Sequence, residues 1–503
     1  MKVLKFGGSS LADAERYLRV KDICLDTHAT NGAAVVLSAP KGVTNALSLL
    51  CEEAGNGKDY GELFAKLNMV LFGILDDLKN TLPEFDDSKL APYIKNVLNE
   101  LNQHLEGFAL LRCAPESVVA KILSIGEYMS VNIFSQILTT LGTKNQIIDP
   151  AELILAEGDY LDSIADVAVS KARFSDVDSS GDVVLIMPGF VAVNAEGEKV
   201  TLGRNGSDYS AAILAACIDA QCCEIWTDVD GVYNADPNQI DGAVLLDKLT
   251  YQEAMELSYF GAKVLHPKTI GPIAQHHIPC LIRNTLNPAA PGTLISNEKS
   301  TKWTSVKGIS HLDDMTMFNV AGPGMKGMVG MASRVFEVMS NANISISLIT
   351  QSSSEYSISF CIHSKDATRA QDLLEDSFAL ELANNLLDPI EVRHDLAIVT
   401  LVGDGMRHSQ GLAAKFFSNL HAIDVFLVGC GTVGKELLGQ IARQQAVLLE
   451  RGISLKIYGI ANSRKLLLEA SGVDLNADWA GQLNNSEQSL SVDALQRGKI
   501  ITR

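Results

Sequence analysis

Two charged side chains stand within a run of glycine and hydroxyl residues at positions 203–210, GRNGSDYS, of this 503-residue sequence. Arg204 could bind a carboxylate through two parallel hydrogen bonds, which a lysine does less well. Asp208 could hold Mg²⁺ or orient neighbouring groups. An apolar run at 211–216 follows, so the segment is also typical of a helix start, with Ser207 or Asp208 as the N-cap. The two interpretations are compatible.

A lysine and a glycine pair end the first apolar run of the chain, in the segment KFGGSS at positions 5–10. The Lys5 ammonium and the backbone N–H groups at Gly7 and Gly8 could hold a phosphate group. The spacing is not that of a Walker A loop, and a glycine pair after a strand is most often only a turn. This segment alone therefore does not identify a phosphate site.

Paired carboxylates follow another apolar run, in the segment TDVDGVY at positions 227–233. Asp228 and Asp230 are two positions apart, but the glycine stands fourth rather than sixth when counted from Asp228, which does not fit a calcium loop. A nucleotide-binding turn is favoured, with Tyr233 available to stack on a base or to contact a ribose.

Three further titratable residues lie in short motifs. Lys263 and His266 occur in GAKVLHP at 261–267, where a histidine before a proline is more often structural than catalytic. Glu127, in SIGEYMS at 124–130, is typical of an acidic residue in the first turn of a helix.

The elements that must position these residues alternate between strands and helices. Helical spacing extends over 47–141, and we expect strands at 2–6, 33–37, 146–148, 183–187, 223–227 and 279–282. Strand, glycine turn, helix and strand in succession indicate a parallel α/β sheet. Ligands bind beyond the carboxyl ends of such strands. We therefore expect one site where the turns at 5–10, 38–45, 188–190, 203–208 and 227–233 converge.

Seven segments together resemble the amino-acid kinase superfamily, and within it the aspartate kinases, over about residues 1–295. They are KFGGSS, SAPKGVTN, SIGEYMS, PGF, GRNGSDYS, TDVDGVY and YFGAKVLHP, in family order. The sequence is most similar to the N-terminal part of threonine-sensitive bifunctional aspartate kinase–homoserine dehydrogenases. The resemblance implies a catalytic domain at 1–296 with a mainly parallel sheet between helices. It also implies transfer of the γ-phosphate from ATP, with Mg²⁺, to L-aspartate, the first step towards threonine, methionine and lysine.

The resemblance also implies roles for individual residues. Lys5, Gly8 and Asp208 would be catalytic. The substrate aspartate would contact Thr44, Glu127, Phe190, Arg204 and Ser207. The nucleotide would contact Gly7, Ser9, Thr227, Asp228, Asp230, Tyr233 and Lys263. The acceptor carboxylate, with a reference pKa near 3.9, is already ionised at neutral pH and needs no general base. Lysines, backbone donors and Mg²⁺ would supply the electrostatic stabilisation that remains to be provided.

An internal repeat follows a polar segment at 297–307 that we expect to be a linker. GPGM at 322–325 matches GDGM at 403–406, and Ala332 and Phe336 match Ala413 and Phe417 at the same offset. The repeat resembles a pair of ACT domains, an α+β module at 308–393 and a truncated copy at 394–422. This implies a homo-oligomer, dimer or tetramer, and threonine as effector near Asn343 and Gln351. A purely structural dimerisation module is the alternative, and the truncation predicts weakened or lost threonine inhibition.

Gly429, Gly431 and Gly434 form a G-x-G-x-x-G pattern between an expected strand at 424–428 and an expected helix at 435–449. Residues 423–503 resemble an incomplete NAD(P)-binding Rossmann segment of homoserine dehydrogenase. No acid ends the next strand at 455–460, and Arg464 with Lys465 favours NADP. Because only about one β-α-β unit is present, we expect no dehydrogenase activity. A retained NADP-dependent dehydrogenase and a non-catalytic amino-acid sensor remain the alternative functions.

The composition argues against several other classes of protein. A formal net charge of −19 disfavours a nucleic-acid partner. No apolar run approaches the roughly 20 residues of a membrane span, and the N-terminus lacks the pattern of a targeting signal. The nine cysteines are scattered, without the spacing of zinc ligands. We therefore expect a cytoplasmic enzyme with reduced thiols.

Overall fold

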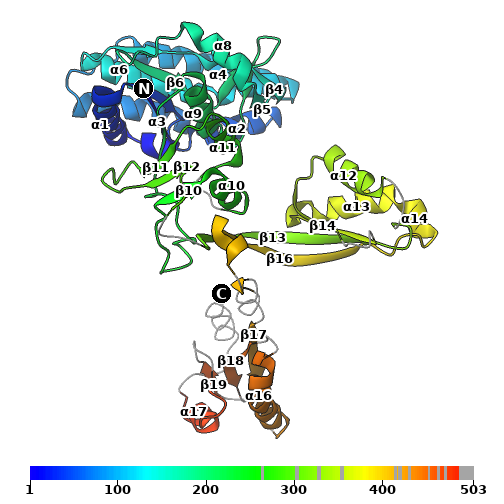
Figure 1. Ribbon diagram of the computed structural model, residues 1–503. Coiled ribbons are helices and arrows are strands. Elements are labelled where there is room, and N and C mark those ends of the chain that lie inside the picture. The colour runs from blue at the N-terminus through cyan, green and yellow to red at the C-terminus, as the bar shows by residue number, and fades with distance from the viewer. Residues whose placement is uncertain are drawn as a thin grey trace. The chain divides into compact units, whose positions relative to one another are not determined.

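The computed structural model divides into two compact units, 1–404 and 405–503, which are described separately (Figure 1). The described residues are 1–261, 265–300, 305–325, 330–351, 356–409, 411–412, 416, 422–428, 432–450, 454–461, 465–468 and 473–486. No helix within these ranges combines the length and apolarity needed to span a bilayer.

An eight-stranded sheet forms the centre of the first unit, in the order β10-β12-β11-β9-β1-β2-β6-β3. Its strands are β1 (Lys2–Phe6), β2 (Ala33–Leu37), β3 (Asn145–Ile147), β6 (Val184–Pro188), β9 (Cys223–Thr227), β10 (Lys248–Thr250), β11 (Cys280–Asn284) and β12 (Thr293–Ser296). Each adjacent pair is parallel except β11 with β12. The expected mainly parallel sheet is confirmed, and the expected strands agree with the observed ones to within one or two residues.

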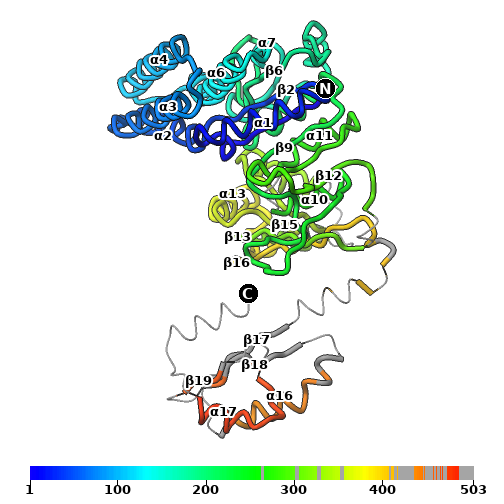
Figure 2. The backbone as a smooth tube through the Cα atoms, turned by 90° about the vertical axis from the view of Figure 1, so that its left-hand side faces the viewer, coloured from blue at the N-terminus to red at the C-terminus, as the bar shows by residue number. Residues whose placement is uncertain are grey.

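Helices cover both faces of this sheet because the strand side chains alternate between two apolar cores. Leu4 and Phe6 of β1 belong to one core, and Val3 belongs to the other. The first core is completed by α1 (Ala14–Asn31), α2 (Val43–Gly55), α3 (Gly61–Thr81), α4 (Leu90–Leu111), α5 (Glu116–Leu123) and α6 (Ile125–Thr140). The second contains residues of α9 (Gly206–Cys217), α10 (Tyr251–Tyr259) and α11 (Pro267–Gln275). Figure 2 shows α1 to α4 grouped along one side of the sheet.

Short elements complete the part of the first unit that contains this sheet and border the sheet. They are η1 (Gly8–Leu11), α7 (Pro150–Leu153), α8 (Val167–Arg173), η2 (Phe174–Asp176) and the hairpins β4 (Ala156–Asp159) with β5 (Asp162–Ala165) and β7 (Val191–Val193) with β8 (Lys199–Thr201).

A second, antiparallel sheet has the order β14-β15-β13-β16. Its strands are β13 (Gly308–Ala321), β14 (Ile346–Gln351), β15 (Ser357–His363) and β16 (Glu391–Val402), with η3 (Ser364–Asp366), α12 (Met331–Asn341), α13 (Ala367–Ser377) and α14 (Ala379–Ala383). Residues of α12 and α13 form a core with the sheet. Most of β16, which we assigned to the second repeat, pairs along β13 of the first. Beyond β16, the second GxGM turn begins η4 (Asp404–His408), and Ala413 and Phe417 lie outside the described residues.

The second unit contains a β-α-β arrangement. Strand β17 (Ala422–Val428) is parallel to β18 (Ser454–Ala461), with α16 (Thr432–Glu450) between them in sequence. The unit also contains β19 (Leu466–Leu468) and α17 (Trp479–Asn485). The expected strand, helix and strand are all present. Gly434 lies in the first turn of α16, whereas Gly429 and Gly431 lie outside the described residues.

Candidate active site

A cavity of about 930 Å³ lies where β1, β2 and β6 end and α9 begins. Four of the five turns expected to converge contribute residues to it, as does Glu127 of α6. Of the site residues expected from sequence, Lys5, Gly8, Ser9, Thr44, Glu127, Phe190, Arg204, Ser207 and Asp208 line this cavity.

The fifth turn, 227–233, lies at the same edge of the sheet but does not line this cavity. Trp226 at the end of β9 is in register with Phe6, so Thr227 follows directly beside the phosphate-loop candidate. The Asp230 carboxylate accepts a hydrogen bond of 2.7 Å from the Asn284 amide. Gly7 also stands outside the lining, and Lys263 lies outside the described residues.

Lys5 and Asp208 form a buried ion pair in the cavity wall, with 2.5 Å between Nζ and Oδ1. Each side chain is about one-tenth exposed. This Oδ1 atom has no hydrogen-bond partner of regular geometry, so the contact is best described as ionic. Lys5 is the penultimate residue of β1, whereas Asp208 lies in the first turn of α9. The pair thus holds a strand end and a helix start together at the cavity.

Close backbone packing explains why glycine stands at two positions of the site. A Cβ atom on Gly8 would lie 2.9 Å from the carbonyl oxygen of Ala39, and one on Gly126 would lie 2.5 Å from the Ala39 Cβ. The loop after β2 is therefore packed between the 5–10 turn and α6. This packing brings Thr44, in the first turn of α2, and Glu127 to one cavity.

Glu127 is a buried carboxyl group in the cavity wall, and its pKa is raised. It is 3% exposed, and burial raises the pKa of its carboxyl to about 8, although hydrogen bonds from backbone N–H groups and the Lys5 charge act in the opposite direction. Its Oε2 atom is buried without a hydrogen-bond partner. A buried polar atom without a partner is costly. This oxygen is therefore suited to accept a hydrogen bond from a ligand, and an ammonium group would stabilise its charged form.

Arg204 presents an exposed side chain to the same cavity. Its loop is fixed by Gly206, where a Cβ would lie 2.7 Å from the Phe190 ring, and by Ser210. The Ser210 hydroxyl accepts a hydrogen bond from Phe190 N and donates one to the Gly206 carbonyl. Phe190 itself has a positive φ of 71°. The N-terminus of α9, which favours anions, thereby lies at the cavity beside the exposed Arg204 guanidinium.

His266 also lines the cavity, although sequence reasoning assigned it a structural role only. Its Nδ1 accepts a hydrogen bond of 3.3 Å from Lys268 N and so caps α11. Burial, followed by the charge of Lys268, lowers the pKa of His266 below its usual value, so the ring is neutral at pH 7. The cap was predictable from the His-Pro pair. The place of the ring at the cavity depends on packing between α10 and α11.

Comparison with protein families now places this architecture. Residues 1–284 match the model of the amino acid kinase family, and residues 318–378 match an ACT domain. The chain is 31% identical to the lysine-sensitive aspartokinase 3 of Escherichia coli, over 86% of this chain and 94% of that protein. The chain belongs to the amino acid kinase family, in its aspartokinase branch.

Bifunctional aspartokinase/homoserine dehydrogenases are also similar. Those of Haemophilus influenzae and Buchnera aphidicola are 42% and 39% identical, each over 98% of this chain. The chain spans 66% of the length of these two relatives. A crystal structure of E. coli aspartokinase III with aspartate and ADP has a TM-score of 0.72 at 29% identity, covering 84% of this chain and 91% of that one. These matches confirm the expected kinase fold followed by an ACT domain.

Proposed function

We propose that this aspartokinase transfers the γ-phosphoryl group of ATP to the side-chain carboxylate of L-aspartate, giving ADP and 4-phospho-L-aspartate. One observation carries the proposal. A single cavity contains a buried carboxylate oxygen without a partner, on Glu127, an exposed guanidinium, on Arg204, and a buried ammonium, on Lys5. These groups complement the ammonium of aspartate, its α-carboxylate and the transferred phosphoryl group, respectively.

The chemistry requires positioning and charge stabilisation rather than a general base. The attacking carboxylate is ionised at neutral pH, and the barrier is the approach of two anions in line. Lys5 and the backbone donors at the start of α9 are arranged to stabilise the charge that develops on the phosphoryl oxygens. Mg²⁺ would be held mainly by ATP phosphates and water, with Asp208 as a carboxylate available in the cavity wall.

An ATP-dependent assay that traps aspartyl phosphate as the hydroxamate tests this function. We expect aspartate-dependent product from the unaltered chain and at least a hundredfold less from Lys5→Met, since removing a group that stabilises the transition state costs about 10²–10³ in rate. Lys21→Met, which removes a partly exposed pair with Asp22, is the matched control. Turnover by Lys5→Met within threefold of that by the control would contradict the role of Lys5.

The ACT domain is the proposed effector site, and threonine is the proposed ligand. Asn343, with a positive φ of 52°, precedes β14, whereas Gln351 ends that strand. Threonine titration of the Asn343→Ala and Gln351→Ala variants would show which residue lies at the effector, and a homo-oligomer remains part of the proposal.

NADP binding by residues 423–503 is the second candidate function. The observation that favours it is the parallel pairing of β17 and β18 on either side of α16, which is the arrangement of a dinucleotide-binding unit. Calorimetric titration of this chain with NADPH tests the binding, and an NADPH-linked homoserine dehydrogenase assay tests turnover.

A further inference from the structure

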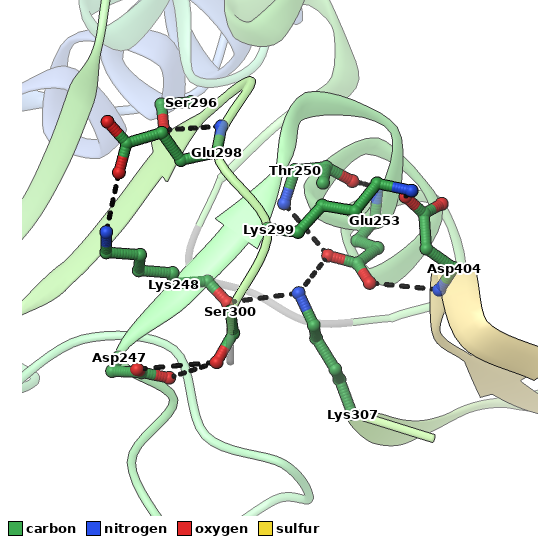
Figure 3. Close-up of polar contacts among 10 residues, drawn as sticks. All are labelled: Asp247, Lys248, Thr250, Glu253, Ser296, Glu298, Lys299, Ser300, Lys307 and Asp404. Carbon is green, nitrogen blue, oxygen red and sulfur yellow. Dashed lines mark hydrogen bonds and ion pairs between the residues drawn. The ribbon is translucent and has the colours of Figure 1, made fainter. Parts of the chain in front are cut away.

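A buried carboxylate on α10 links the domain that contains the eight-stranded sheet to the sheet of the ACT domain. Glu253 lies in the first turn of α10 and is 1% exposed. It forms a capping box with Thr250: Thr250 N donates to Oε2 at 2.9 Å, and Glu253 N donates to the Thr250 hydroxyl at 3.2 Å. Figure 3 shows that two more segments approach the same carboxylate.

Those two segments are the ends of the long antiparallel pair formed by β13 and β16, here called the ribbon. Lys307, one residue before β13, is 4% exposed and places its Nζ 2.5 Å from Glu253 Oε2. It also donates to the Lys248 carbonyl at 3.3 Å. Asp404, two residues after β16, donates its backbone N–H to Glu253 Oε1 at 3.0 Å. The polar segment that we expected to be a simple linker therefore ends in a buried ion pair.

The other end of α10 is held by the same ribbon. The Ser310 hydroxyl donates a hydrogen bond to the Phe260 carbonyl, directly after the helix. At Gly261, where φ is +108°, a Cβ would lie 2.2 Å from the His311 carbonyl oxygen, so only glycine allows this approach. Residues 307–311 thus hold α10 at both of its ends.

The position of α10 determines part of the active-site wall. Chain continuity leads from Gly261 to His266, which lines the cavity and caps α11. Leu265 and the α10 residue Leu257 belong to the same apolar core. A displacement of α10 would therefore move His266 in the cavity wall relative to Arg204 and Asp208. The charges of both residues act on the His266 ring.

We infer that Glu253 is a positioning residue through which the ribbon keeps α10 and His266 in the arrangement that binds aspartate. The ACT-domain sheet is then a structural part of the catalytic site even without an effector. The kinetic part of this inference rests on the proposed kinase function.

Glu253→Gln and Lys307→Met test the inference alone and together. Glutamine keeps an oxygen for the capping box, and methionine keeps the apolar stem of the lysine, so α10 retains its local contacts. Each single change leaves one buried charge without its partner, whereas the double change leaves none. The control is the double variant Lys248→Met/Glu298→Gln, which removes the neighbouring exposed pair drawn in Figure 3.

We expect each single variant to raise the KM for aspartate about tenfold with kcat changed less than threefold. This corresponds to a modest displacement of one wall of the cavity, since a tenfold change, about 1.4 kcal/mol, is less than half of the usual cost of an unpaired buried charge. The double variant should lie within threefold of the unaltered chain, as should the control. Amide hydrogen exchange in peptides covering 251–261 and 265–275 should be faster in the single variants only.

Two results would overturn the inference. One is a lower melting temperature in the single variants with an unchanged KM for aspartate, because this is the result of a purely structural role. The other is a double variant in which the increases in the KM for aspartate from the two single changes multiply, so that their free-energy effects are additive. If the unaltered chain shows no aspartate-dependent ADP release, the proposed function fails instead. The exchange measurements still decide whether Glu253 holds α10 and the start of α11.

Discussion

The carboxyl of Glu127 should make aspartate binding depend on pH in a direction set by its burial. With a pKa of about 8 in place of 4.5, only about one-tenth of this group is ionised at pH 7 in the empty enzyme. An aspartate ammonium needs the ionised form. The KM for aspartate should therefore fall roughly tenfold from pH 6 to pH 7 and about fivefold from pH 7 to pH 8.

Glu127→Gln should remove this dependence and raise the KM for aspartate. A hydrogen bond to a charged group contributes about 1.5–3 kcal/mol, so we expect a rise of about 10- to 100-fold at pH 8. Initial rates between pH 6 and pH 8.5 at saturating ATP measure both effects. Glu116→Gln, an exposed acid in the first turn of α5, is the control. A flat profile in the unaltered chain would refute the reasoning, as would an equally steep one in Glu127→Gln.

The raised pKa of Glu127 also predicts how the free energy of unfolding depends on pH. Its folded-state pKa lies above its unfolded-state value, so its contribution is fully present below about pH 4.5 and is lost as pH rises to about 8. Ionising it inside the unliganded fold costs up to about 5 kcal/mol, which corresponds to the difference between a pKa of about 8 and the ordinary value of 4.5. Glu127→Gln should therefore unfold at a higher temperature than the unaltered chain at pH 8.5, with little difference at pH 5. Differential scanning calorimetry without ligands checks the sign.

Two further predictions concern the rest of the cavity. Arg204→Lys should raise the KM for aspartate about tenfold or more, because lysine cannot make the bidentate contact with a carboxylate. The affinity for ADP, measured by calorimetry, should stay within twofold. Equal losses of affinity for both ligands would contradict the assignment of Arg204 to aspartate. Gly8→Ala should lower kcat/KM at least tenfold, since the new Cβ would lie 2.9 Å from the Ala39 carbonyl and displacing catalytic groups by about 1 Å can cost 10²-fold. The control is Gly73→Ala in α3, where the added Cβ would have no neighbouring atom within 4 Å apart from its own helix backbone. This variant should keep full activity and unfold at a slightly higher temperature.

The sheet could be predicted from sequence because its signals are local. The runs 2–6, 33–37 and 223–227 are apolar and end in turn residues, and they became β1, β2 and β9 with the expected bounds. The convergence of turns follows from the geometry of parallel strands, since all carboxyl ends lie at one edge. Knowledge of the strands was therefore enough to predict that Lys5 and Arg204 could share a cavity, whereas Glu127, which lies on α6, was expected there only from the resemblance to aspartate kinases.

The remaining features depend on partners distant in sequence. The segment 297–307 is polar, yet Lys307 is buried because Glu253 lies opposite it. His266 reaches the cavity through the packing of α10 and α11, which no local pattern specifies. The pKa of Glu127 depends mainly on the apolar and backbone groups around it. Composition predicts the average burial of a residue type, and these three residues differ from the average for reasons of tertiary contact.

The net charge of −19 raises the question of how the cavity attracts two anionic substrates, and the answer depends on Glu127. Charges more than a Debye length of about 8 Å away are largely screened. The charges of the residues that line the cavity therefore determine how strongly it attracts anions. Lys5, Lys41 and Arg204 outnumber Asp208 while Glu127 is neutral. Ionising Glu127 adds a negative charge, so ADP should bind more weakly as pH rises from 6.5 to 8.5, the direction opposite to that for aspartate. Calorimetric titration of ADP with Mg²⁺ should show this decline in the unaltered chain and a flatter profile in Glu127→Gln. If ADP affinity rises with pH in both proteins, the phosphates are not influenced by this carboxylate, and ionisation of the nucleotide itself dominates.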